Sequence, residues 1–228
     1  MARKIRARGG RPLLLPGLSL RGVSDLNAAQ VALQRGLAAD VLIFSSPAAV
    51  RFAAALAPLE TSAIVLAVGQ GTARALRRHG IRTPLVPNRQ DSEGLLDHPA
   101  LSDLRSRRVV LIGAAGGRGL LRDTLRELGA QLHELHVYRR VAPRLDRRHV
   151  EALRQLSTSA RVLLSSAEAL NHLCRLLPPD ALGRLQQATA VVSSVRLAAA
   201  ARAAGFKQIV EATSALSADM LGAAARQR

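Results

Sequence analysis

Five short polar segments of the chain follow apolar runs and precede stretches with helical periodicity. They are Ser45-Ser46, Gly69-Gln70-Gly71-Thr72, Gly113 to Arg118, Ser165-Ser166 and Ser193-Ser194. Unpaired N–H groups and the helix dipole make each helix start attractive to a carboxylate or a phosphate. In a parallel sheet such loops share the carboxyl edge, where ligands bind. Together the segments predict a site for a large polyanion.

The sequence does not match the motifs of dinucleotide-binding, Walker-type or metal sites. Gly69-Gln70-Gly71 lacks the third glycine of a dinucleotide fingerprint, and Gly113 to Gly119 is not followed by the Lys-Ser or Lys-Thr of a Walker loop. His133 and His136 are three apart in a predicted strand and point to opposite faces, so no shared metal is expected. We expect no cofactor, and a chemistry that needs little from side-chain acids and bases.

The segments recur because the chain contains an internal repeat. The run Asp40–Val50 is similar to the run Arg161–Leu170. Ser165 corresponds to Ser45, at an offset of 120 residues (165 minus 45). The segment from Ala67 to Ile81 is similar to the segment from Val191 to Phe206, at an offset of 125 residues. A period this long predicts two related α/β lobes, and clefts between domains are common ligand sites.

Short apolar runs alternate with helical periodicity throughout. Expected strands are 41–44, 64–68, 85–87, 109–112, 132–138, 162–164, 190–192 and 209–210. Expected helices are 47–59, 71–79, 92–96, 119–128, 167–177, 195–204 and 217–225. This alternation predicts an α/β fold with parallel sheets covered by helices on both faces.

A further match concerns the first residues. Leu128–Leu135 corresponds to Arg8–Leu15, so the counterpart of the strand Val109–Ile112 would lie before Met1. We therefore expect the first lobe to lack one strand, through a start assigned too late or the loss of a βα unit. The adjacent strand would then have unpaired edges.

Composition narrows the class of protein. The formal net charge is +17, and all but two of the 33 basic residues, Lys4 and Lys207, are arginine. This charge fits an anionic ligand, or a compositional bias alone. Cys174 is the only cysteine and is expected to be a buried structural thiol. Without an 18-residue apolar run or a cleavage-site pattern, a soluble cytoplasmic enzyme is the simplest expectation.

The order of five segments resembles the uroporphyrinogen-III synthase family. These are VLIFSSPAAV, AVGQGTARAL, DSEGLL, GGRGLL and VYRRV. The resemblance covers the chain from Gly9 onward and implies two α/β lobes joined by a two-stranded ladder. Lobe one would comprise 1–20 plus 145–228, lobe two 25–136, and the hinge ladder 18–24 and 137–144.

The resemblance also implies a reaction. The substrate would be hydroxymethylbilane, a linear tetrapyrrole with eight carboxylates, cyclised with loss of water and inversion of ring D. Positioning and fixed dipoles would supply most of the catalysis. Tyr138, the only tyrosine, matches the residue proposed to help the hydroxyl leave; a packing role at the hinge is the alternative. Implied substrate-binding residues are Ser45, Ser46, Gly69, Thr72, Gly117, Arg118, Ser165, Ser166 and Ser194.

Three departures from the family pattern are present. The first strand is absent, Gly113-Ala114-Ala115 replaces a frequent Arg-Gly-Glu, and Ser194-Val195-Arg196 stands where the other repeat has Gly69-Gln70-Gly71. The alternatives are a non-catalytic tetrapyrrole-binding relative and a two-lobed small-anion-binding module. Nucleic-acid binding is disfavoured because stacking aromatics do not interleave the basic residues. No membrane partner is expected, and a monomer is expected.

Overall fold

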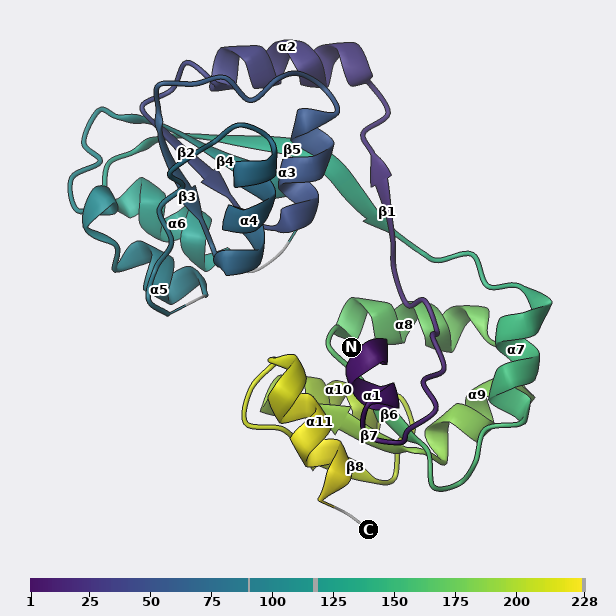
Figure 1. Cartoon of the computed structure of the whole chain (residues 1–228). Coiled ribbons are helices and arrows are strands. Elements are labelled where there is room, and N and C mark those ends of the chain that lie inside the picture. Colours follow the sequence, from purple (N-terminus) through teal and green to yellow (C-terminus); the bar gives the residue numbers. More distant parts are fainter. Residues whose placement is uncertain (90, 117–118, 227–228) are drawn as a thin grey trace. The chain divides into compact units, whose positions relative to one another are not determined.

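The chain folds into two α/β units, each with its own sheet (Figure 1). The computed structural model describes residues 1–89, 91–116 and 119–226. Unit 1 comprises Met1–Ser19 with Val141–Arg228, and unit 2 comprises Leu20–Arg140. Four strands of the unit 2 sheet and the three strands of the unit 1 sheet pair in parallel, which confirms the predicted fold class.

The sheet of unit 2 has the strand order β1-β5-β4-β2-β3. Its strands are β1 (Ser19–Gly22), β2 (Val41–Phe44), β3 (Ile64–Ala67), β4 (Arg108–Ala114) and β5 (Gln131–Val141). The central strand β2 pairs with both β3 and β4, and its four residues are fully buried. Because β2 is covered on both faces, all four of its residues are apolar.

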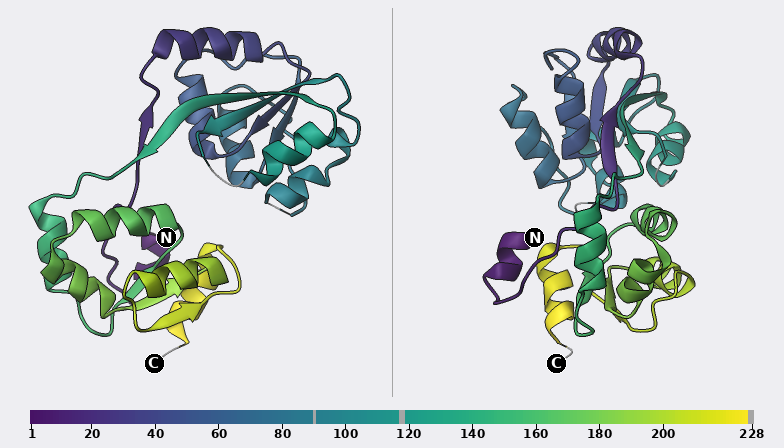
Figure 2. Two further views of the ribbon diagram at one scale, coloured as in Figure 1. Left: turned by 180° about the vertical axis from the view of Figure 1, so that it is seen from behind. Right: turned by 90° about the vertical axis from the view of Figure 1, so that its right-hand side faces the viewer.

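Helices cover both faces of this sheet (Figure 2). They are α2 (Leu26–Gly36), α3 (Pro47–Ala54), α4 (Gln70–Arg78), α5 (Ser92–Leu96) and α6 (Leu120–Glu127), with a 3₁₀ turn at Pro99–Leu101. Leu42 and Phe44 pack towards α3 and α4, whereas Val41 and Ile43 pack towards α5 and α6. This alternation follows from the two-residue period of a strand.

Unit 1 has the strand order β6-β7-β8. Its strands are β6 (Arg161–Leu163), β7 (Thr189–Val192) and β8 (Ile209–Glu211). Its helices are α1 (Ala2–Arg6), α7 (Arg147–Arg154), α8 (Ala167–Leu176), α9 (Pro179–Gln186), α10 (Val195–Ala203) and α11 (Ser217–Ala225). The larger core lies under α7 to α10, and α11 covers the other face with Met220 and Ala223.

Three sequence predictions are wrong in detail. The expected strand at Leu85 is a single bridge to Leu66. Leu13 to Leu15 correspond in the repeat to residues 133–135 of an expected strand, but they form no strand, although Leu15 packs on the larger core of unit 1. The helix expected to reach Leu59 ends at Ala54, because the following Pro58 disfavours helix in the residue before it.

Candidate functional site at the carboxyl ends of the strands

The carboxyl ends of β2, β3, β4 and β5 meet at one edge of the unit 2 sheet. Ser45 and Ser46 follow β2, Gly69 follows β3 after Val68, and Ala114 at the end of β4 is opposite Tyr138 of β5. The sequence prediction that these loops share an edge is therefore met within unit 2. Gly117 and Arg118 lie outside the described residues.

The side chains of Ser46 and Tyr138 form a hydroxyl pair at this edge. Ser46 Oγ and Tyr138 Oη lie 3.2 Å apart, and either hydroxyl can donate the hydrogen bond. Ser46 Oγ also accepts a hydrogen bond from the Ala49 N–H at 3.1 Å, which makes Ser46 the N-cap of α3. The cap fixes the serine hydroxyl, so the phenol is held by a group that cannot rotate freely.

The ring of Tyr138 is fixed by packing. Only 7% of the residue is exposed, and its ring stacks on Phe52 with centroids 5.3 Å apart and an interplanar angle of 14°. The Arg51 guanidinium lies 5.1 Å from the centroid of the Phe52 ring. Sequence reasoning missed Phe52, which lies in helix α3.

An irregularity in β5 turns Tyr138 into the core. Gly113 is opposite His136 but Ala114 is opposite Tyr138, so Val137 is an extra residue in the ladder. In a regular strand Val137 and Tyr138 would point to opposite faces. Here both are buried in the core that also contains Leu135. The irregularity thus brings the phenol towards α3 and its Ser46 cap.

Ser45 has a different role from Ser46. Its Oγ donates a hydrogen bond to the Ile112 carbonyl at 3.1 Å, and its N–H donates to the same oxygen at 3.1 Å. A Cβ on Gly113 would lie 2.5 Å from Ser45 Oγ, so glycine is needed there for steric reasons. Ser45 therefore ties the end of β2 to β4.

The remaining predicted residues of unit 2 differ in accessibility. Gly69 is the N-cap of α4 and has no side chain with which to cap it. Thr72 is 3% exposed, so its side chain belongs to the core, while its N–H donates to the Gly69 carbonyl at 3.0 Å. The Arg140 guanidinium donates to the Ala115 carbonyl at 3.3 Å and ties β5 to the loop after β4.

At the carboxyl edge of unit 1, as in unit 2, serine residues cap the helices that follow the strands. Ser166 Oγ accepts from the Ala169 N–H at 3.2 Å and caps α8, as Ser46 does for α3. Ser194 Oγ accepts from the Leu197 N–H at 3.3 Å and caps α10. Ser165 is exposed, as Ser45 is. The residue 120 positions before Tyr138 is Leu18, so the hydroxyl pair is a feature of unit 2 alone.

Asp146, Cys174 and Asp180 of unit 1 have displaced pKa values. The Arg154 guanidinium, which donates to Asp180, lowers the pKa of that carboxyl. A hydrogen bond from the His149 N–H lowers the pKa of Asp146, and burial raises the pKa of the Cys174 thiol. Among the described residues, no group of His, Cys, Asp or Glu could hold a metal ion. His136 and His133 are both exposed, and His136 lies beside Glu134.

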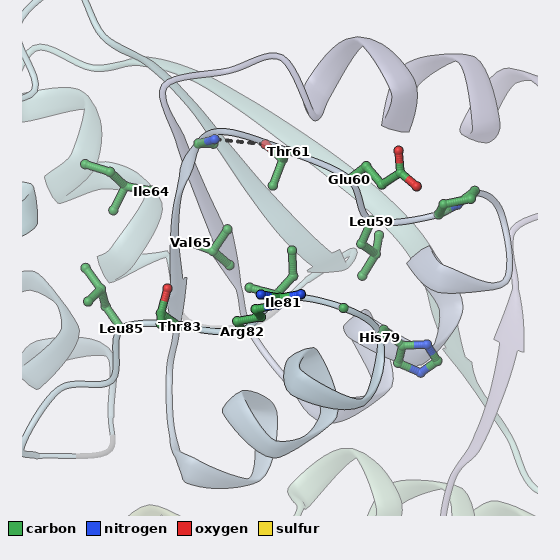
Figure 3. Close-up of a pocket in the computed structure, with 13 residues that line it drawn as sticks. Leu59, Glu60, Thr61, Ile64, Val65, His79, Ile81, Arg82, Thr83 and Leu85 are labelled. Carbon is green, nitrogen blue, oxygen red and sulfur yellow. Dashed lines mark hydrogen bonds between the residues drawn. The ribbon is translucent and has the colours of Figure 1, made fainter.

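A separate cavity of about 650 Å³ lies in unit 2 (Figure 3). Residues before β3, such as Leu59 and Thr61, and residues after α4, such as His79 and Arg82, line it. Ile64 and Val65 at the start of β3 also contribute. The cavity is therefore at the amino end of β3, and it contains none of the predicted site residues.

The fold and the edges define a class of protein. It is a two-unit α/β protein in which hydroxyl groups and helix N-termini lie at the carboxyl ends of parallel strands.

Two solved structures share the fold over nearly the whole chain. The uroporphyrinogen-III synthetase of Helicobacter pylori 26695 aligns with a TM-score of 0.65 and 15% identity, covering 93% of this chain and 91% of that one. A mutant uroporphyrinogen III synthase of the extremely thermophilic bacterium Thermus thermophilus aligns with a TM-score of 0.59 and 23% identity, covering 96% and 90%.

Sequence comparison gives the family. The family model described as "Uroporphyrinogen-III synthase HemD" matches residues 1–222, and the chain belongs to the uroporphyrinogen-III synthase family. It is 34% identical over 152 residues to the uroporphyrinogen-III synthase of Escherichia coli K12, covering 65% of this chain and 61% of that protein. It is 30% identical over 144 residues to a putative uroporphyrinogen-III synthase of Methanothermobacter thermautotrophicus, covering 61% and 56%. The matched region thus spans about three fifths of these curated relatives.

Within the described residues, the structure contains no helix that is both long enough and apolar enough to cross a membrane.

Proposed function

We propose that the protein is a uroporphyrinogen-III synthase that cyclises hydroxymethylbilane, with inversion of ring D and loss of water. The observation that carries the proposal is the Ser46–Tyr138 hydroxyl pair at the carboxyl edge of a family member. Tetrapyrrole biosynthesis is the family's process, and a hydro-lyase step is its expected reaction class.

The hydroxyl pair suits the first chemical step. The terminal hydroxyl of the bilane leaves as water when it takes up a proton, and an electrophilic azafulvene remains. Tyr138 can donate that proton from Oη while Ser46 donates its own hydrogen bond to the phenol oxygen. The substituted carbon of ring D then attacks, the resulting spiro intermediate fragments, and closure gives the inverted macrocycle. The proton released on closure restores the phenol.

Backbone donors suit the carboxylates of the substrate. Helices α3, α4, α8 and α10 each begin at a carboxyl edge and are eight to ten residues long. We propose that their N-termini bind substrate carboxylates through N–H groups and helix dipoles. The proposed binding residues are Ser45, Ser46, Gly69, Thr72, Gly117, Arg118, Ser165, Ser166 and Ser194. The net charge of +17 would steer a polyanion towards the protein.

A binding protein without catalysis is the second candidate. The observation that favours it is the three-stranded sheet of unit 1, which has one parallel strand fewer than the β5-β4-β2-β3 array of unit 2. A reduced sheet could still present the Ser166 and Ser194 caps to an anionic tetrapyrrole without supporting turnover.

One experiment separates the two candidates. Freshly prepared hydroxymethylbilane is incubated with the protein, and the ratio of isomers III and I is measured against a protein-free control. The proposed synthase gives mainly isomer III. Isomer I at the spontaneous rate, together with saturable tetrapyrrole binding, would establish the binding-only role. Isomer I without binding would contradict both.

A further inference from the structure

Helix α4 of unit 2 and helix α10 of unit 1 end in the same way. Gly80 follows α4 with a φ angle of 95°, and Gly205, at the offset of 125, follows α10 with a φ angle of 90°. The next residues, Ile81 and Phe206, each donate their N–H to a carbonyl of the preceding helix. The segments that follow the two helices thus start from equivalent positions.

The two segments also reach their sheets at equivalent positions. Leu85 is bridged to Leu66 of β3, and Val210 is paired with Val191 of β7. Both residues of the second pair lie 125 positions after those of the first. Because the start and the end of each segment correspond, a difference between the segments must arise in the residues that lie between.

One backbone hydrogen bond of unit 1 has no equivalent in unit 2. In unit 1, the Ala190 N–H donates to the Gln208 carbonyl at 2.9 Å. The equivalent groups of unit 2 are the Val65 N–H and the Thr83 carbonyl, which form no hydrogen bond in the described part of the chain. The Ile64 N–H donates towards β2, so the Val65 N–H points to the outer side, because alternate residues of a parallel strand address opposite neighbours.

The Val65 N–H therefore lacks the partner that its counterpart has. Val65 is only 6% exposed, so its N–H has little access to bulk solvent. A buried N–H without a hydrogen bond is rare and unfavourable, and it commonly marks the place of a water molecule, an ion or a ligand.

Pro84 accounts for this difference between the units. It stands at the position where unit 1 has Ile209. The proline ring fixes φ at about −65°, whereas a parallel strand has φ of about −120° and favours β-branched residues such as isoleucine. The segment of unit 2 therefore joins β3 only at Leu85, and a gap opens before it.

The cavity shown in Figure 3 lies at this gap. Its volume of about 650 Å³ is within the ~300 to 1,000 Å³ of most small-molecule sites. Val65 and Thr83 line it from the two diverging segments, and Leu59 and Ile81 add aliphatic walls. A water molecule occupies about 30 Å³ and needs two or more polar partners, so water alone would leave these walls wet. The cavity therefore suits an organic molecule with an acceptor for the Val65 N–H.

The charged residues of the cavity favour an anion. Arg82 lines the cavity next to Thr83, its side chain is exposed, and it forms no ion pair with the described residues. Glu60 is the only acidic residue among those described in the lining, and His79 is a second basic one. Figure 3 shows Glu60 and His79 at one side of the cavity and Val65 at the other. The polar groups available to a ligand are therefore mainly donors, which a carboxylate matches.

We propose that this cavity is a second ligand site of the protein, for a small carboxylate with an apolar body. One carboxylate oxygen accepts from the Val65 N–H and takes the place that the Gln208 carbonyl has in unit 1. The Arg82 guanidinium pairs with the negative charge, and the apolar body lies against Leu59 and Ile81. The site is at the amino end of β3, away from the carboxyl edge, so it does not depend on the proposed synthase function.

The test uses cinnamate as the probe and the isotope-labelled full-length protein. Cinnamamide, which has nearly the same shape but no charge, is the matched comparison. We expect saturable cinnamate binding that shifts the NMR signal of the Val65 amide, and cinnamamide binding weaker by roughly tenfold or more. Equal binding of the two probes would overturn the proposal. An absence of saturation, which leaves water as the occupant, or shifts confined to the Ser45, Ser46 and Gly69 amides at the carboxyl edge would overturn it as well.

Two arginine variants test the role of charge. Arg82→Gln should weaken cinnamate binding roughly tenfold, because the charge-assisted pairing is lost. Arg78→Gln removes the same charge from an exposed position of α4 outside the cavity lining and should leave binding unchanged. Equal weakening by the two variants would mean that only the net charge attracts the probe, and the proposal would be wrong.

A third variant tests the gap itself. Pro84→Ile introduces the residue of unit 1 and should allow the Thr83 carbonyl to accept from the Val65 N–H. We expect slower exchange of the Val65 amide without probe, and cinnamate binding weakened roughly tenfold or more. Thermal unfolding checks that the variant is folded, and the exposed Arg82 position tests the site independently of this change. Undiminished cinnamate binding by folded Pro84→Ile would contradict the proposal.

Discussion

The hydroxyl oxygens of Ser46 and Tyr138 lie 3.2 Å apart although 92 positions separate the two residues in the chain. Two local features create this contact. The N-cap of α3 orients the serine, and the extra residue in β5 turns the tyrosine towards that cap.

Replacing Tyr138 by Phe removes the proposed proton donor and keeps the stacking on Phe52. We expect turnover of hydroxymethylbilane to slow by about 10- to 1000-fold, in the range of general-acid catalysis. Isomer III should still dominate, because the folding of the bound chain decides which carbon attacks. Single-turnover assays with product isomer analysis measure both quantities. Normal turnover would reduce Tyr138 to a packing role, and mainly isomer I would mean that it shapes the substrate.

Replacing Ser46 by Ala should alter the surroundings of Tyr138 without unfolding the protein. The lost helix cap costs about 1 kcal/mol of stability. Tyr138 is the only tyrosine and there is no tryptophan, so intrinsic fluorescence reports on this phenol alone. We expect the emission intensity to change in Ser46→Ala. Ser166→Ala removes the matching cap of α8 and is the control, with a similar loss of stability and unchanged emission.

Replacing Gly113 by Ala should destabilise the protein through a steric clash. The new Cβ would lie 2.5 Å from Ser45 Oγ, and overpacking of this kind costs about 1 to 3 kcal/mol. Ser45→Ala should restore part of the loss, since it removes the clashing oxygen. Urea unfolding of the two single variants and the double variant measures the coupling free energy. Additive losses would show that the clash is relieved elsewhere.

The Asp180–Arg154 pair predicts a pH dependence of stability. Because the folded-state pKa of Asp180 is lowered by Arg154, its contribution is present above the unfolded-state pKa and is lost as pH falls through the folded value. Thermal unfolding of the protein and of Asp180→Asn should therefore differ most near neutral pH. The difference should shrink below the usual aspartate pKa of about 4. A constant difference across this range would contradict the assignment.

The Cys174 thiol should react slowly. Burial raises its pKa, so less thiolate is present at neutral pH than in a free cysteine. Alkylation by iodoacetamide, followed by mass spectrometry, should be slower than for a cysteine-containing peptide and should reach the peptide rate in denaturant. Alkylation of the native protein at the peptide rate would mean that the site opens readily.

Local sequence patterns predicted those helices and strands that are determined by residues close together in the chain. Ser46 and Ser166 were recognisable as caps because each precedes a helical run, and the apolar run at Val41 identified the central strand. Helices α2, α7 and α9 were missed. In α7, four of the eight residues are charged, so its apolar stripe is short.

Features that depend on a neighbouring strand could not be predicted in this way. The extra residue at Val137 is defined only by the register of β5 against β4. Leu13 to Leu15 match a strand of the other repeat but form none, because a strand requires a paired neighbour and the described residues provide none there. The stacking of Phe52 on Tyr138 likewise arises from packing between α3 and β5.

Unit 2 is a single uninterrupted stretch of chain, from Leu20 to Arg140, set within the sequence of unit 1. The strands at its two ends, β1 and β5, are neighbours in one sheet. A stretch whose ends lie side by side can be cut out and closed by a short linker, because little chain entropy is lost in joining them. Unit 2 could therefore be exchanged between relatives, or circularly permuted, as one continuous segment, while the two flanking segments that form unit 1 are kept.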